Sequence, residues 1–77
     1  MDVQRLRQMA DQIARNLAVR GPDAAAAAMA EHIAQFWDPR MRAAIIADRR
    51  EALSPIAASA IDLLAARTAP GQALGPE

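Results

Sequence analysis

Apolar residues recur every three or four positions in the first twenty residues of the chain, which is the spacing of one helix face. The recurring positions are Val3, Leu6, Met9, Ala10, Ile13 and Leu17. Asp2 precedes them and is suited to cap the first helical turn. The pattern therefore predicts an amphipathic helix that begins after Asp2 and runs to about Val19.

A second helix is predicted from about Pro22 to Phe36. Gly21 suits a C-terminal cap, Pro22 suits the first turn of the next helix, and Asp23 adds negative charge where the helix dipole favours it. The short turn predicts that the two helices are antiparallel. The bulky apolar residues come late, at Met29, Ile33, Phe36 and Trp37. The alanine-rich first half either permits close approach of another helix or is low-complexity filler.

A capping residue followed by proline occurs twice more and marks two further helix starts. Asp38-Pro39 predicts a third helix that runs to about Leu53, and Ser54-Pro55 predicts a fourth that runs to about Arg67. The buried face of the fourth helix is expected to comprise Ile56, Ala60, Ile61, Leu63 and Leu64.

No stretch alternates between apolar and polar residues as a strand does. We therefore expect an all-α fold, a small bundle of three to four short helices. Residues 1–67 are expected to form a single helical domain. Residues 68–77 contain two prolines and two glycines without hydrophobic periodicity, so a flexible, disordered C-terminal tail is expected there.

The apolar residues of this sequence predict a thin hydrophobic core, with little buried area. About half of them are alanines, which bury little area each. A small domain with such a core gains little net stability after the entropy cost of ordering the chain. We infer that the chain is either barely stable alone or completed by a partner.

The charges of the 77 residues balance to zero, and every basic residue is arginine. This neutrality argues against a general nucleic-acid binder. The exclusive use of arginine either reflects a GC-rich genome or suits interface contacts. No stretch approaches the roughly 20 apolar residues that span a bilayer, and the N-terminus lacks a signal-peptide core. We expect a cytoplasmic protein without a membrane partner.

Catalytic chemistry has little support in this sequence. Cysteine is absent and His32 is the single histidine, whereas metal sites need several converging ligands. A nucleophile–base pair is also unsupported, because Ser54, Ser59 and Thr68 have simpler roles as cap, helix residue and tail residue. We expect no catalytic, cofactor-binding or metal-binding residue, and no enzymatic activity, in this chain.

Both aromatic residues and two arginines lie within Phe36-Trp37-Asp38-Pro39-Arg40-Met41-Arg42, at a helix boundary. Neighbouring helical residues point about 100° apart, so one core does not easily bury both rings. Core packing is expected for Phe36, whereas Trp37 either packs in the core or contacts a partner. His32 lies one turn before Phe36 and can stack near it, as an ordinary helix histidine or as part of a docking surface.

Arg40 and Arg42 fall near the start of the third predicted helix, where the dipole disfavours cations by about 0.3–1 kcal/mol. Two explanations are open. Asp38 either pairs with one guanidinium, or the arginines are held for a carboxylate, a phosphate or carbonyl groups on another molecule.

The segment from His32 to Arg42 resembles the signature of the delta subunit of NAD-dependent formate dehydrogenase. Met9-Ala10-Asp11-Gln12-Ile13-Ala14 is similar to the opening helix of that family, and the resemblance covers residues 4 to 54. It implies a non-catalytic accessory subunit of a cytoplasmic molybdenum- or tungsten-dependent enzyme that oxidises formate and reduces NAD. The larger subunits carry the bis-molybdopterin guanine dinucleotide, iron–sulfur clusters and FMN in that family, and this chain is expected to carry no cofactor.

The resemblance further implies docking on the catalytic alpha subunit, in support of assembly, molybdenum cofactor insertion or stability of the complex. Trp37 is expected as the apolar anchor, with Arg40 and Arg42 as polar ones. The whole predicted partner-binding set is His32, Phe36, Trp37, Asp38, Pro39, Arg40, Met41 and Arg42. One alternative is a small helix-turn-helix regulator that binds DNA through Arg40, Arg42, Arg49 and Arg50. Another is a self-associating helical protein that forms a homo-oligomer when isolated.

Overall fold

The computed structural model describes residues 2–68, and these form four α-helices. They are α1 (Val3–Leu17), α2 (Pro22–Phe36), α3 (Pro39–Ala47) and α4 (Pro55–Thr68), with short 3-10 turns at η1 (Ala18–Arg20) and η2 (Arg50–Ala52). The predicted all-α fold is confirmed, since none of the described residues is in a strand. Apart from Thr68, which ends α4, the predicted tail lies outside the described residues.

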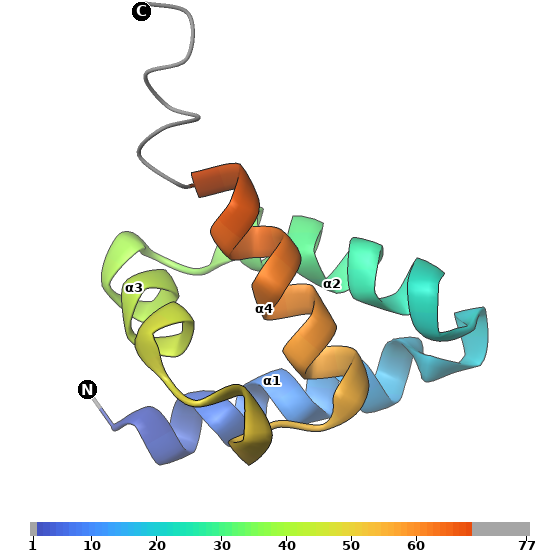
Figure 1. Ribbon diagram of the computed structural model, residues 1–77, viewed down its shortest axis with the longest axis horizontal. Coiled ribbons are helices and arrows are strands. Elements are labelled where there is room, and N and C mark those ends of the chain that lie inside the picture. The colour runs from blue at the N-terminus through green and yellow to red at the C-terminus, as the bar shows by residue number, and fades with distance from the viewer. Residues whose placement is uncertain (1, 69–77) are drawn as a thin grey trace, which may run out of the picture.

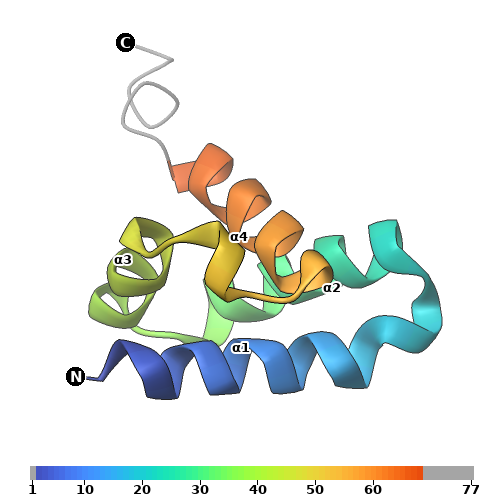
Figure 2. The same ribbon diagram turned by 60° about the horizontal axis from the view of Figure 1, so that its bottom comes forward.

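The helices form a small bundle in which α4 crosses α1 and α2 (Figure 1). Figure 2 shows that α1 and α2 run antiparallel and that α3 lies beside the N-terminal end of α1. The most extensive helix contact is between α2 and α4. No helix within residues 2–68 is long and apolar enough to span a membrane.

Local capping determines where three of the helices begin. The Asp2 carboxylate accepts a hydrogen bond from the backbone N–H of Gln4 at 3.0 Å, and Asp38 accepts one from Met41 at 2.9 Å. The Ser54 hydroxyl accepts one from the backbone N–H three residues later, at 3.4 Å. Each cap satisfies an N–H group that lacks a partner within its helix. The predicted starts of α1, α3 and α4 are therefore confirmed.

The predicted ends of the first and third helices are wrong. The chain tightens into η1 after Leu17, two residues before Val19. The third helix ends at Ala47 instead of Leu53, because Asp48 takes an extended backbone conformation with φ −78° and ψ 167°. The Arg7 guanidinium of α1 donates to the Asp48 side chain and holds it in this position. Arg50 closes the following turn, because its guanidinium donates to the backbone carbonyl oxygens of Ile46 and Asp48, both at 2.9 Å.

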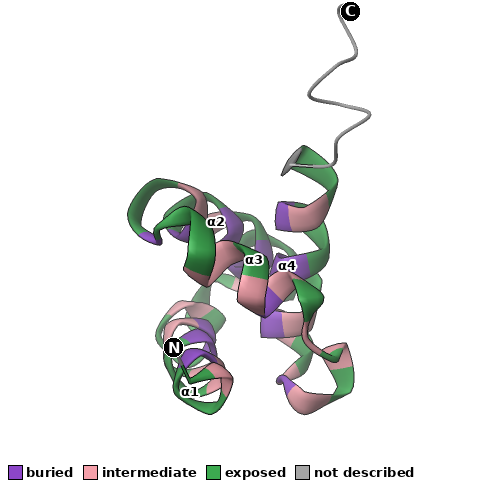
Figure 3. Cartoon of the chain, turned by 90° about the vertical axis from the view of Figure 1, so that its left-hand side faces the viewer, coloured by how far each residue is buried: buried purple, intermediate pink, exposed green. Residues whose placement is uncertain are grey.

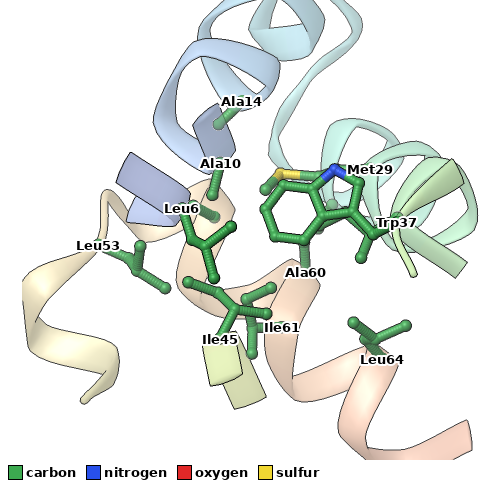
Figure 4. Close-up of a cluster of buried hydrophobic side chains, with 13 residues drawn as sticks. Leu6, Ala10, Ala14, Met29, Trp37, Ile45, Leu53, Ala60, Ile61 and Leu64 are labelled. Atoms are coloured by element: carbon green, nitrogen blue, oxygen red, sulfur yellow. The ribbon is translucent and has the colours of Figure 1, made fainter. Parts of the chain in front are cut away.

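Buried side chains from all four helices form the core (Figures 3 and 4). Its largest fully buried members are Met29, Ile33, Ile45, Ile61 and Leu64. Seven of the fifteen buried apolar residues in the described chain are alanines, as the thin-core interpretation predicts. Leu63 was expected on the buried face of α4 but is 46% exposed, because Ala57, Ala60, Ile61 and Leu64 form that face.

Candidate functional site

The adjacent residues Phe36 and Trp37 face opposite ways at the end of α2. Phe36 is 71% exposed, whereas Trp37 is 4% exposed and lies in the core cluster with Met29 and Ala60 (Figure 4). The prediction that Phe36 packs in the core is wrong. Helical spacing accounts for the difference: Trp37 lies four residues after the buried Ile33 and continues the covered face of α2, whereas Phe36 lies four residues after the exposed His32. An accessible anchor on this segment is therefore Phe36 and not Trp37.

The exposed Phe36 ring stacks on His32, one helical turn earlier. Their ring centroids are 4.9 Å apart and the planes are inclined by 37°. The predicted contact between the two residues is confirmed. Both side chains are exposed, so the pair forms an aromatic surface on α2 that the rest of the bundle does not cover.

Arg42 and Arg40, two residues apart in α3, have different surroundings. Arg42 is half-buried, and its guanidinium donates to the carbonyl oxygens of Trp37 and, at 3.4 Å, Ala34. Carbonyl groups at a helix end lack intrahelical partners, and a cation is favourable there. Arg42 thus caps α2 and does not pair with Asp38. Arg40 is exposed, and its side chain has no hydrogen bond or ion pair with the other described residues.

The predicted partner-binding residues therefore fall into three groups. Five are exposed, namely His32, Phe36, Asp38, Pro39 and Arg40. Met41 and Arg42 are half-buried, and Trp37 is buried. The structure brings the His32–Phe36 pair and Arg40 to the surface around the α2–α3 junction, and it removes the indole from that surface.

A groove that the sequence did not predict lies between α1 and the end of α2. Its volume is about 510 Å³, and it is lined by Arg5, Gln8, Met9, Gln12, Ile13, His32 and Trp37. His32 belongs to both the groove and the aromatic pair. The periodicity does not indicate this groove, because it places Met9 in the apolar stripe of the first helix, whereas Met9 is 37% exposed in the structure.

A second hollow, of about 390 Å³, lies between α1 and the start of α4. Asp11 and Ser54 meet here, and the Asp11 carboxylate accepts a hydrogen bond from the Ser54 backbone N–H at 3.0 Å. This contact joins residues 43 positions apart. We assign this hollow a structural role, since its acidic side chain is used to fix the beginning of α4.

Ion pairs connect the helices elsewhere. The Arg7 guanidinium donates two hydrogen bonds to Asp48, one of them at 2.7 Å, and lowers the pKa of that carboxyl from 3.8 to about 2. Arg67 pairs with Glu31 at 2.8 Å and lowers the pKa of that carboxyl. The first pair connects α1 with the residue that follows α3, and the second connects α4 with α2. No group of three or more metal-ligating side chains occurs within residues 2–68.

A family model described as the NADH-dependent formate dehydrogenase delta subunit FdsD matches residues 5–61. The chain belongs to this family. The match includes the His32–Phe36 pair, Arg40 and every residue that lines the groove. It also extends seven residues beyond the predicted limit at 54, into the part of α4 that supplies Ala57, Ala60 and Ile61 to the core. A delta subunit is one component of a formate dehydrogenase complex that contains other subunits.

No curated protein and no solved structure gives a match to the chain.

Proposed function

We propose that this delta subunit is a non-catalytic accessory subunit that docks on the catalytic alpha subunit of a cytoplasmic NAD-dependent formate dehydrogenase. Docking supports assembly, molybdenum cofactor insertion or stability of the complex. The observation that carries the proposal is the exposed His32–Phe36 pair at the end of α2, followed by the exposed Arg40 in the first turn of α3. Aromatic residues and arginine are enriched at protein interfaces, and large exposed apolar groups mark interaction sites.

The energetics of Phe36 favour a partner. Burial of a phenylalanine side chain contributes about 1.5–3 kcal/mol, and the isolated chain leaves most of this unrealised at Phe36. The alanine-rich core offers little to compensate. A partner surface that covers the His32–Phe36 pair would recover the burial energy, and Arg40, which pairs with none of residues 2–68, can pair with a carboxylate of the partner.

The redox cofactors of the proposed complex, bis-molybdopterin guanine dinucleotide, iron–sulfur clusters and FMN, are assigned to its larger subunits. This assignment rests on the family resemblance, and for the iron–sulfur clusters it is supported by the donor set, because the chain has no cysteine to ligate a cluster. Residues of this chain would act on the catalytic subunit through contact alone.

The DNA-binding alternative has less support from the geometry. It assigns four arginines to phosphate contacts, but Arg42 caps α2 and Arg50 pairs with Asp62 at 2.7 Å. Two of the four are thus engaged within the chain. The formal net charge of zero also provides little attraction for phosphates.

Co-purification from cells that express the full complex tests the proposal. The tagged chain is expected to recover the alpha subunit together with formate-dependent NAD reduction. Phe36→Ala and Arg40→Ala are expected to lower the recovered alpha subunit by about tenfold or more, as interface hot spots do. The matched control is Val19→Ala, an equally apolar change at a residue that is 90% exposed in η1.

The proposal is wrong if the tagged chain purifies without the alpha subunit while the formate dehydrogenase is expressed. Docking through the α2–α3 junction is wrong if Phe36→Ala and Arg40→Ala both recover as much alpha subunit as Val19→Ala does.

A further inference from the structure

We propose that the groove between α1 and the end of α2 binds an acidic amphipathic segment of the catalytic subunit. The apolar side chains of that segment enter the groove, and a carboxylate pairs with Arg5. The inference rests on the proposed function and deepens it, because it gives the chemistry of the partner and adds α1 to the contact surface.

The floor of the groove is apolar. Met9 is 37% exposed, Ile13 is half-buried, and the largely buried Trp37 is the third apolar residue that lines the groove. Methionine adapts its shape to different partners and is frequent at binding surfaces. The volume of about 510 Å³ lies in the range of about 300–1,000 Å³ that is usual for small-molecule pockets, which is room for a few side chains. The groove therefore suits side chains of a partner better than a whole second domain.

The charged side chain that lines the groove is positive. Arg5 is the charged residue that lines it, and no carboxylate lies among the lining residues. Within residues 2–68 the Arg5 side chain makes no hydrogen bond or ion pair. It occupies the first turn of α1, where the dipole disfavours a cation, so the helix itself does not account for it. A partner carboxylate would satisfy this guanidinium.

Two carboxylates near the residues of the groove in sequence, Asp2 and Asp38, each cap a helix. Asp2, three residues before Arg5, accepts the N–H of Gln4 as the cap of α1. Asp38, next to Trp37, accepts the N–H of Met41 as the cap of α3. Neither carboxylate is bound to the guanidinium of Arg5, which is consistent with an acidic group that comes from another molecule.

The groove is continuous with the docking surface proposed above. His32 lines the groove on one side and stacks on Phe36 on the other. A segment laid along the groove from α1 would thus meet the exposed Phe36 ring at the end of α2. The polar rim formed by Gln8 and Gln12 offers amide groups to the backbone or polar side chains of such a segment.

The test uses the full chain and a formate dehydrogenase complex purified from a strain that lacks it. Dissociation constants are measured for wild type, Arg5→Glu and Met9→Glu. Each variant is expected to bind at least about tenfold more weakly, since one reverses the charge and the other places a charge on the apolar floor. Arg20→Glu is the matched control, because it reverses an exposed charge in η1 outside the groove. Circular dichroism melting is expected to show that all variants fold.

Two further measurements identify the occupant. A photo-crosslinking amino acid at position 9 is expected to attach to an acidic amphipathic segment of the catalytic subunit. Added salt is expected to weaken wild-type binding more than it weakens Arg5→Gln, because salt screens the proposed ion pair.

The outcomes separate the two proposals. Loss of binding by Phe36→Ala together with wild-type binding by Arg5→Glu and Met9→Glu overturns the groove assignment and leaves the accessory function intact. A crosslink from position 9 to a second copy of this chain also overturns it. Absence of binding by the wild-type chain overturns both.

Discussion

The guanidinium of Arg42 donates a hydrogen bond to the backbone carbonyl oxygen of Trp37, five residues earlier in the chain. The donor belongs to α3 and the acceptor follows the last residue of α2, so the contact holds the two helices at their junction. The same nitrogen is 3.4 Å from the carbonyl oxygen of Ala34. This junction is where the chain buries its indole and leaves Phe36 at the surface.

Replacement of Arg42 by alanine is expected to lower the free energy of unfolding by about 1.5–3 kcal/mol, because it removes a charged hydrogen bond to otherwise unpaired carbonyl groups. Arg40→Ala removes the same charge two residues away and is expected to change stability by less than about 0.5 kcal/mol. Urea denaturation followed by circular dichroism measures both. Equal effects would show that Arg42 does not cap α2.

The adjacent aromatic residues are expected to respond oppositely to truncation. Trp37→Ala leaves a cavity in the core and is expected to cost about 3–5 kcal/mol, a large part of the stability of a small domain. Phe36→Ala is expected to stay within about 0.5 kcal/mol of wild type, because its ring is exposed. Thermal unfolding of the two variants checks this, and a larger loss for Phe36→Ala would contradict the orientation of the two side chains.

The Arg7–Asp48 pair is expected to make the bundle sensitive to acid. Hydrogen bonds from Arg7 lower the pKa of Asp48 from 3.8 to about 2, so as the pH falls the unfolded chain takes up this proton before the folded chain does. The contribution of the pair is complete above pH 3.8 and is lost as the pH falls towards about 2. Asp48→Asn removes the titrating group.

Denaturation of wild type and Asp48→Asn over this pH range provides the measurement. The variant is expected to be less stable near neutral pH and to lose less stability on acidification. Arg7→Gln, which removes the donor and retains the carboxyl, is expected to show the same reduced dependence. Parallel pH profiles for all three proteins would exclude the pair as a source of acid sensitivity.

Gly21 is expected to resist replacement. Its backbone has φ 94° and ψ 154°, a region that is almost restricted to glycine. An added Cβ would meet no atom within 4 Å, so any cost comes from the backbone and not from a clash. Gly21→Ala is expected to lower the free energy of unfolding by about 1–3 kcal/mol in a calorimetric measurement. An unchanged stability would show that the turn into α2 tolerates negative φ.

The end of α3 illustrates why helix boundaries were only partly predictable. The residues after Ala47 continue a helix-compatible composition, and local reasoning extends the helix to Leu53. The structure instead uses Asp48 as the partner of Arg7, 41 residues away. A contact across that separation depends on how α1 and α3 pack, and no local pattern contains it.

The candidate site was likewise only partly predictable from the sequence. The distinctive segment from His32 to Arg42 was evident from composition and family resemblance, and the His32–Phe36 contact followed from helical spacing. The roles within the segment were not evident. Trp37, for which core packing and partner contact were both open, is buried on the covered face of α2, Phe36 is exposed instead of packed in the core, and Arg42 is engaged by its capping contact with α2.

The sequence by itself determined the all-α class, the starts of the helices and membership of the delta-subunit family. The class and the helix starts depend on capping residues, prolines and apolar periodicity, which act within a few residues, whereas the family membership rests on the match over residues 5–61. Tertiary structure alone decided the end of α3, which face of α2 the other helices cover, and the groove between α1 and α2. Each of these requires side chains from distant segments to meet, and the free energy of that packing outweighs the weak local preferences of the chain.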